Sequence, residues 1–85
     1  MTLDERMTAL IAVGASVAAN CGPCLDHHAG KARAAGAGAD EIAQAIEVGK
    51  GARAGAAMMM DRHAAKLPGA SSLAMAASPA GCCRC

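Results

Sequence analysis

Two cysteines and one histidine have the residue types and the spacing to do chemistry. Cys21 and Cys24 form a Cys-x-x-Cys pair, and His28 follows Cys24 by four residues. If Pro23 lies in the first turn of a helix, the three side chains share one helix face. Cysteines at this spacing can close a disulfide, and a helix N-terminus favours the nucleophilic thiolate. An imidazole one turn away can exchange a proton with the sulfur.

The same side chains are also compatible with a metal site. Cys21, Cys24 and His28 could supply three zinc ligands, and a cysteine near the C-terminus could supply the fourth. Thiols also bind softer ions such as copper(I), mercury or arsenic(III). From the residues alone, three interpretations stay open: a redox pair, a metal site and inert structural thiols.

The composition indicates one small domain with few large apolar side chains. Among 85 residues there are 24 alanines and no Phe, Tyr or Trp, and the formal net charge is +1. This excludes the basic surface and the stacking aromatics typical of nucleic-acid binding. A core so poor in large side chains predicts close packing through Ala and Gly, completed by homo-oligomerisation.

Helical spacing predicts three helices, over residues 3–20, 23–35 and 39–66. Gly36 suits the left-handed position just after the second helix. No segment alternates like a strand, so the predicted fold class is all-α, a small antiparallel helical hairpin or bundle. Two stripes of mainly apolar or small residues follow from this spacing: Leu3, Met7, Leu10, Ile11, Gly14, Ala18 and Cys21, and then Ile42, Ala45, Ile46, Gly49, Arg53 and Ala56.

Three glycines inside the third predicted helix need a reason. Gly49, Gly51 and Gly55 each cost about 1 kcal/mol relative to alanine in a helix interior. They are expected where another helix approaches closely. Arg53, on the same stripe, is expected to pair with Glu47 or with a neighbouring subunit.

The two ends of the sequence lead to expectations about location and domains. Asp4 and Glu5 are unlike the start of a secretory signal, and the apolar run 9–19 is too short to span about 30 Å of hydrocarbon. We expect a cytoplasmic protein with no membrane segment. Residues 1–67 are predicted to form the helical domain, and residues 68–85 a flexible tail containing cysteines.

A longer pattern resembles a known family. The Cys21-x-x-Cys24-x-x-x-His28 motif follows an Ala-rich helix, and the segment 31–46 continues it with a Gly-Ala step and then Glu41-Ile42 and Ala45-Ile46. Together these residues resemble the carboxymuconolactone decarboxylase-like family, in its alkylhydroperoxidase D branch. The resemblance covers about residues 3–66.

The resemblance implies an all-helical thiol–disulfide oxidoreductase, a thiol peroxidase that needs no bound cofactor or metal. It implies that Cys24 attacks a peroxide or disulfide substrate, that Cys21 resolves the product, and that His28 relays the proton. It also implies a peroxiredoxin or dithiol reductant as partner, and a trimer or hexamer.

The sequence departs from the family pattern at two positions. Ala9 stands where the family relay usually has Glu, and Pro23 stands where some members have His. Disulfide exchange needs fewer proton-transfer groups than peroxide reduction, so it is the activity that this sequence favours. A lactone decarboxylase is not expected, because that branch does not depend on a cysteine pair.

Several other residues have less specific interpretations. His27 points about 100° away from His28 on a helix and is expected to be exposed. His63 suits a helix C-terminus, and the consecutive Met58, Met59 and Met60 suit an oligomer interface. The cysteines at 82, 83 and 85 could bind metal or relay electrons to the deeper pair, or could be dispensable.

Overall fold

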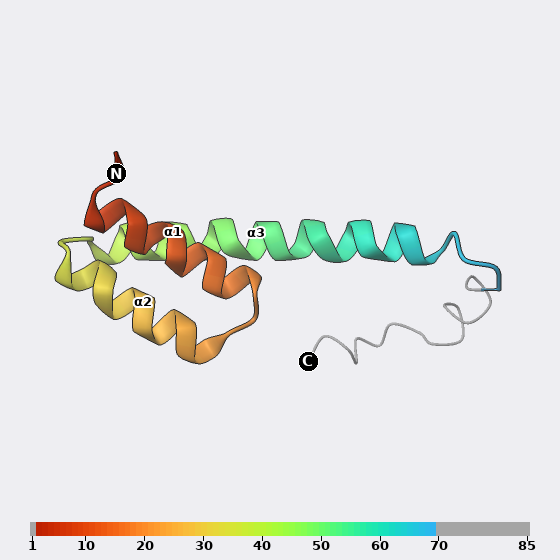
Figure 1. Ribbon diagram of the computed structural model, residues 1–85, viewed down its shortest axis with the longest axis horizontal. Helices are drawn as coiled ribbons and strands as arrows, with labels where there is room; N and C mark the ends of the chain where they lie inside the picture. Colours follow the sequence, from red (N-terminus) through yellow and green to blue (C-terminus); the bar gives the residue numbers. More distant parts are fainter. Residues whose placement is uncertain (1, 70–85) are drawn as a thin grey trace. The chain divides into compact units, whose positions relative to one another are not determined.

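The computed structural model describes residues 2–69, which form three α-helices joined by short turns (Figure 1). The helices are α1 (Glu5–Ala18), α2 (Gly22–Ala34) and α3 (Ala39–Ala64). No strand occurs among these residues, so the predicted all-α class is confirmed. None of the described helices is both long and apolar enough to cross a membrane.

The core lies where α1 and α2 run side by side in opposite directions (Figure 1). Val13 is completely buried, and Ala29 and Ala32 of α2 are buried with it. Alanines on α2 let the two helix backbones approach closely, as an Ala-rich sequence requires. The core is completed by Ala9, Ala37 and Ile42.

The stripe of apolar and small residues on the first helix does not coincide with the buried face of α1, although Leu10 of that stripe packs against the core. Leu3, Met7 and Ile11 are 47%, 40% and 54% exposed. The buried positions of α1 are Ala9, Val13, Ser16 and Val17 instead. The physical reason is that α1 has no charged residue after Arg6, so more than one of its faces is apolar. The face with Ala9, Val13, Ser16 and Val17 has the smaller side chains and fits α2 more closely.

α1 and α3 meet at a pair of glycines. A Cβ added to Gly49 would lie 2.3 Å from the Gly14 carbonyl oxygen and 2.8 Å from Val17 Cβ. The close approach predicted for the third helix is therefore found at Gly49. Around Gly51 and Gly55, by contrast, an added Cβ would have no neighbour within 4 Å in the described chain.

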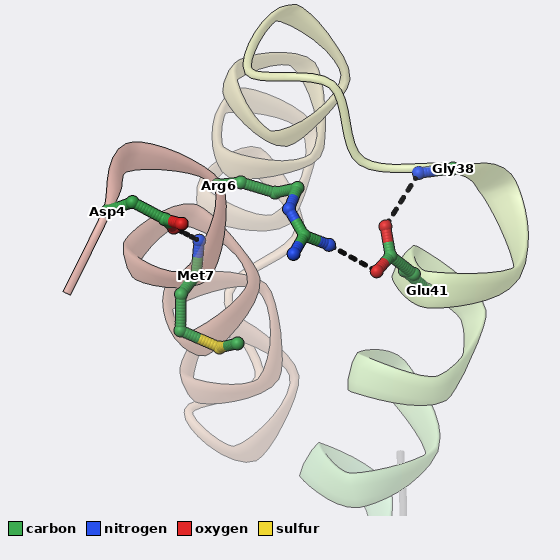
Figure 2. A network of polar contacts seen from close by, with 5 residues as sticks. All are labelled: Asp4, Arg6, Met7, Gly38 and Glu41. Atoms are coloured by element: carbon green, nitrogen blue, oxygen red, sulfur yellow. Dashed lines mark hydrogen bonds and ion pairs between the residues drawn. The ribbon is translucent and has the colours of Figure 1, made fainter.

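Polar contacts tie the start of α3 to α1 (Figure 2). Glu41 accepts a hydrogen bond from the Gly38 N–H at 3.0 Å, which is half of a capping box. Its other carboxylate oxygen pairs with Arg6 of α1. The Gly38 N–H and the Arg6 guanidinium lower the pKa of Glu41, and the carboxylate in turn raises the pKa of Arg6. Asp4 caps α1 by accepting from the Met7 N–H at 2.7 Å.

The chain divides into two compact units, and the division falls within α3, after Gly55. The first unit holds α1, α2 and every contact described above. In the second unit, α3 ends at Ala64 and is followed by turns, and the Ala65 N–H donates to the backbone carbonyl oxygen of Asp61. The predicted boundary between a domain of residues 1–67 and a tail of residues 68–85 stays a prediction.

Replacing Glu41 tests how α3 is anchored. A lowered pKa in the folded state means that the ionised carboxylate contributes stability above its ordinary pKa of 4.5 and loses it as pH falls through the lowered value. We expect Glu41→Gln to lower the thermal midpoint at about pH 7 and to differ much less from the parent chain at about pH 3.

Glu47→Gln is the matched control for this comparison, because Glu47 makes only an exposed i,i+3 pair with Lys50 within the described chain. Such pairs contribute little to stability. An equal loss in the two variants, or a loss from Glu41→Gln that persists undiminished in acid, would contradict the anchoring role.

Gly49→Ala and Gly51→Ala test the glycine contact within one helix. Alanine gains about 1 kcal/mol of helix propensity at either position. At Gly49 the new Cβ meets the α1 backbone, and overpacking of about 1–3 kcal/mol outweighs that gain. Urea unfolding should show Gly49→Ala destabilised and Gly51→Ala stabilised; a stabilised Gly49→Ala would refute the contact.

Candidate functional site

The junction between α1 and α2 is a single tight turn. The Asn20 N–H donates to Val17 O and the Cys21 N–H donates to Ser16 O, both at 3.0 Å. These two bonds form a Schellman motif, in which the residue after the C-cap takes a left-handed conformation. Asn20 occupies that position with φ 59°, and it is the one non-glycine residue with positive φ in the described chain.

Cys21 ends this turn and is also the N-cap of α2. Its backbone is extended, and its Sγ accepts a hydrogen bond from the Cys24 N–H at 3.2 Å. Sulfur therefore takes the role that a Ser or Asp oxygen usually has at a helix start. Pro23 fits the first turn because the N–H that it lacks would have no partner inside the helix.

The two sulfurs of the predicted pair are bonded to each other. The structure has a Cys21–Cys24 disulfide whose Cα atoms lie 5.2 Å apart. Cys24 is exposed and Cys21 is half-buried. Cys24 is thus the more exposed residue of the pair, while the Cys21 sulfur is held by the start of the helix.

His28 lies on α2 one turn after Cys24 and is half-buried, whereas His27 is exposed, as predicted. The two imidazole rings are 5.0 Å apart, with an angle of 74° between their planes. Within residues 2–69, neither imidazole is hydrogen-bonded to a cysteine sulfur in this disulfide form. The role of His28 as proton relay stays a prediction.

The position of the family glutamate is a core position in this chain. Ala9 is 7% exposed and belongs to the cluster that includes Ala29, the residue after His28. A methyl group therefore occupies a place where the family pattern has a carboxylate, and it can neither accept nor donate a proton.

Arg53 is the residue whose role the sequence did not reveal. Its Nη1 donates to Val17 O at 3.3 Å and to Asn20 Oδ1 at 3.0 Å. Of the two partners expected for Arg53, Glu47 pairs with Lys50 instead, and a pairing with a neighbouring subunit stays a prediction. The available signal was spacing: Arg53 follows Gly49 by one helical turn and so faces the end of α1 that Gly49 contacts.

A cleft of about 290 Å³ opens beside Cys21. The side chains around it are partly apolar and partly cationic. Its lining includes Val17, Cys21, Leu25, Ile46, Lys50 and Arg53.

Two other predictions have different outcomes. Within residues 2–69 no group of three His, Cys, Asp or Glu side chains is placed to hold a metal ion. The cysteines at 82, 83 and 85, which the metal interpretation also uses, lie outside the described residues. Met58, Met59 and Met60 are all exposed on α3, and their use in an oligomer interface stays a prediction.

Comparison with known protein families places the chain beside one of them. The sequence profile of the Carboxymuconolactone decarboxylase family matches residues 2–67, which contain α1, α2 and α3. No curated protein and no solved structure matches the chain.

Two substitutions at Asn20 test the turn that positions Cys21. Both Asn20→Gly and Asn20→Ala remove the side-chain contact with Arg53, but only alanine pays the steric cost of the left-handed conformation. We expect Asn20→Ala to be less stable than Asn20→Gly by about 1 kcal/mol in urea unfolding of the reduced protein. Equal stabilities would show that the turn does not need this conformation.

Proposed function

The chain belongs to the carboxymuconolactone decarboxylase family, and from that premise we propose that it is a thiol–disulfide oxidoreductase of the alkylhydroperoxidase D type. One observation carries the proposal. The Cys21–Cys24 disulfide lies at the start of a helix, with Cys24 an exposed residue and the Cys21 sulfur capping the helix. A purely structural disulfide across three residues would add little, because the loop that it closes is so short.

The division of labour between the two sulfurs follows from their exposure. In the reduced protein, the exposed Cys24 thiolate attacks one sulfur of a substrate disulfide, which leaves a mixed disulfide and one substrate thiolate. The Cys21 thiolate then attacks Cys24 Sγ, forms the Cys21–Cys24 bond and releases the second substrate thiolate. The Cys24 N–H bonded to Cys21 Sγ supports Cys21 as the resolving thiolate.

Peroxide reduction would use the same two sulfurs. Cys24 attacks the peroxide, the O–O bond breaks, and Cys24 becomes a sulfenic acid while an alcohol leaves. Cys21 then displaces hydroxide from that sulfur, and His28 supplies the proton that turns it into water. Because Ala9 has no carboxyl group that could return a proton to His28, we propose that disulfide exchange is faster than peroxide reduction in this chain.

The cycle needs an electron donor and a setting in which thiols are kept reduced. We propose that a dithiol reductant reopens the Cys21–Cys24 bond, that a peroxiredoxin is a possible acceptor of the electrons, and that the protein works in the cytoplasm. We also propose a homotrimer or homohexamer. The exposed Met7, Ile11 and Val48, which line an apolar groove between α1 and α3, support a further subunit contact.

Single-cysteine variants test the proposed order of attack. With a dithiol reductant and a small disulfide as substrate, Cys24→Ser should abolish turnover, because it removes the attacking sulfur. Cys21→Ser should make the mixed disulfide once and then stop. Intact-mass spectrometry should therefore find a stable substrate adduct on the Cys21→Ser variant and none on the Cys24→Ser variant.

The control is the triple variant Cys82→Ser/Cys83→Ser/Cys85→Ser, which removes every other thiol of the chain. It should turn over like the parent protein, and the two single variants are best made in this background. Full turnover by Cys24→Ser, or a loss of turnover in the triple variant alone, would contradict the proposal.

A further inference from the structure

The cleft beside Cys21 is suited to an anion. Lys50 and Arg53 of α3 line it, and no acidic residue does. Gly22 also lines it, and as the first residue of α2 its N–H has no acceptor within the helix. Two cationic side chains and a free amide are thus gathered beside one sulfur of the disulfide.

The contacts that Arg53 and Lys50 already make leave both side chains able to bind an anion. Arg53 uses a single nitrogen, Nη1, for Val17 O and Asn20 Oδ1, so its remaining N–H groups are not needed to hold the turn. Lys50 pairs with Glu47 at 3.0 Å, but both side chains are more than half exposed and such pairs are weak. Glu47 itself does not line the cleft.

The lining of the cleft also includes apolar side chains. Leu25 and Ile46 are both half-buried and line it, as does the buried Val17. An added Cβ on Gly22 would meet no atom within 4 Å in the described chain, so the space above this residue is open. The cleft therefore fits a short aliphatic chain that ends in a negative charge.

We propose that this cleft selects small disulfides that carry a carboxylate. The inference rests on the proposed oxidoreductase function and names its substrate class. The carboxylate lies against Arg53, Lys50 and the Gly22 N–H, and the aliphatic carbons lie against Leu25 and Ile46. Because Cys21 lines the same cleft and Cys24 follows it by three residues at the start of α2, the substrate sulfur is held next to the reacting pair.

The exchange balances without any further reagent. The two thiols of reduced Cys21 and Cys24 are oxidised to one disulfide, and the substrate disulfide is reduced to two thiols. One protein S–S bond forms, one substrate S–S bond breaks, and the two protons pass from the protein thiols to the substrate thiolates. The cleft changes only how tightly the substrate is held during this exchange.

Three aliphatic disulfides of similar size test the proposal: 3,3′-dithiodipropionate (anionic), 2-hydroxyethyl disulfide (neutral) and cystamine (cationic). The oxidation rate of the reduced full-length protein is divided by the rate of each reagent with free 2-mercaptoethanol, which removes intrinsic reactivity. At low ionic strength we expect the anionic reagent to be preferred over the neutral one by about 3- to 10-fold and the cationic one to be slowest. About 1 M salt should remove most of this preference.

Charge-removing variants assign the preference to the cleft. Arg53→Gln and Lys50→Gln should each reduce it, and Arg53→Lys should retain more of it than Arg53→Gln. Arg33→Gln is the matched control: it removes one positive charge at the far end of α2, and it should leave the preference unchanged. Within the described chain the one hydrogen bond of the Lys50 side chain goes to Glu47 and not to the Asn20 turn, so Lys50→Gln tests the charge without removing a hydrogen bond of that turn.

The outcomes separate this inference from the proposed function. Exchange with all three reagents but no preference for the anion, or a preference that Arg53→Gln, Lys50→Gln and Arg33→Gln reduce equally, would overturn the anion cleft and leave the oxidoreductase intact. Exchange with none of the three would overturn both.

Discussion

The site depends on one residue that belongs to two helices at once. Cys21 closes the Schellman turn of α1 through its N–H and caps α2 through its sulfur. Because only residues 19–21 lie between α1 and α2, the sulfur has little freedom to move away from the start of α2. The turn that allows this requires a left-handed conformation at Asn20, and Arg53 of α3 holds the Asn20 side chain in place. α3 thus helps to position the cysteine pair, although neither cysteine belongs to α3.

The small side chains of the chain serve this arrangement. Alanines between α1 and α2 and the Gly14–Gly49 contact between α1 and α3 bring backbones close together. Close backbones allow a short loop and bring Arg53 within reach of the end of α1. The same packing through small residues leaves larger side chains such as Met7, Ile11 and Val48 exposed. These exposed side chains leave an apolar surface available for contact.

Much of this could be predicted from the sequence, because the relevant signals are local. Pro23 and Gly36 mark helix ends, and the Cys-x-x-Cys spacing indicates a disulfide at a helix start; the structure has all three features. The spacing alone does not identify the buried face of α1, because a helix with two apolar faces gives periodicity no preferred side. Arg53 was missed because its partners are a backbone carbonyl and an amide more than thirty residues away. Such a contact depends on how helices pack, which spacing within one helix does not encode.

The most direct test is peptide mass spectrometry of the full-length protein equilibrated in a series of dithiol and disulfide buffers. Trypsin places Cys21 and Cys24 in one peptide, Met7–Lys31, apart from the cysteines at 82, 83 and 85. We expect that a disulfide within this peptide forms and reopens reversibly as the buffer changes. A pair that stays oxidised or reduced in every buffer, or a Cys24 that bonds to the C-terminal cysteines in place of Cys21, would contradict it.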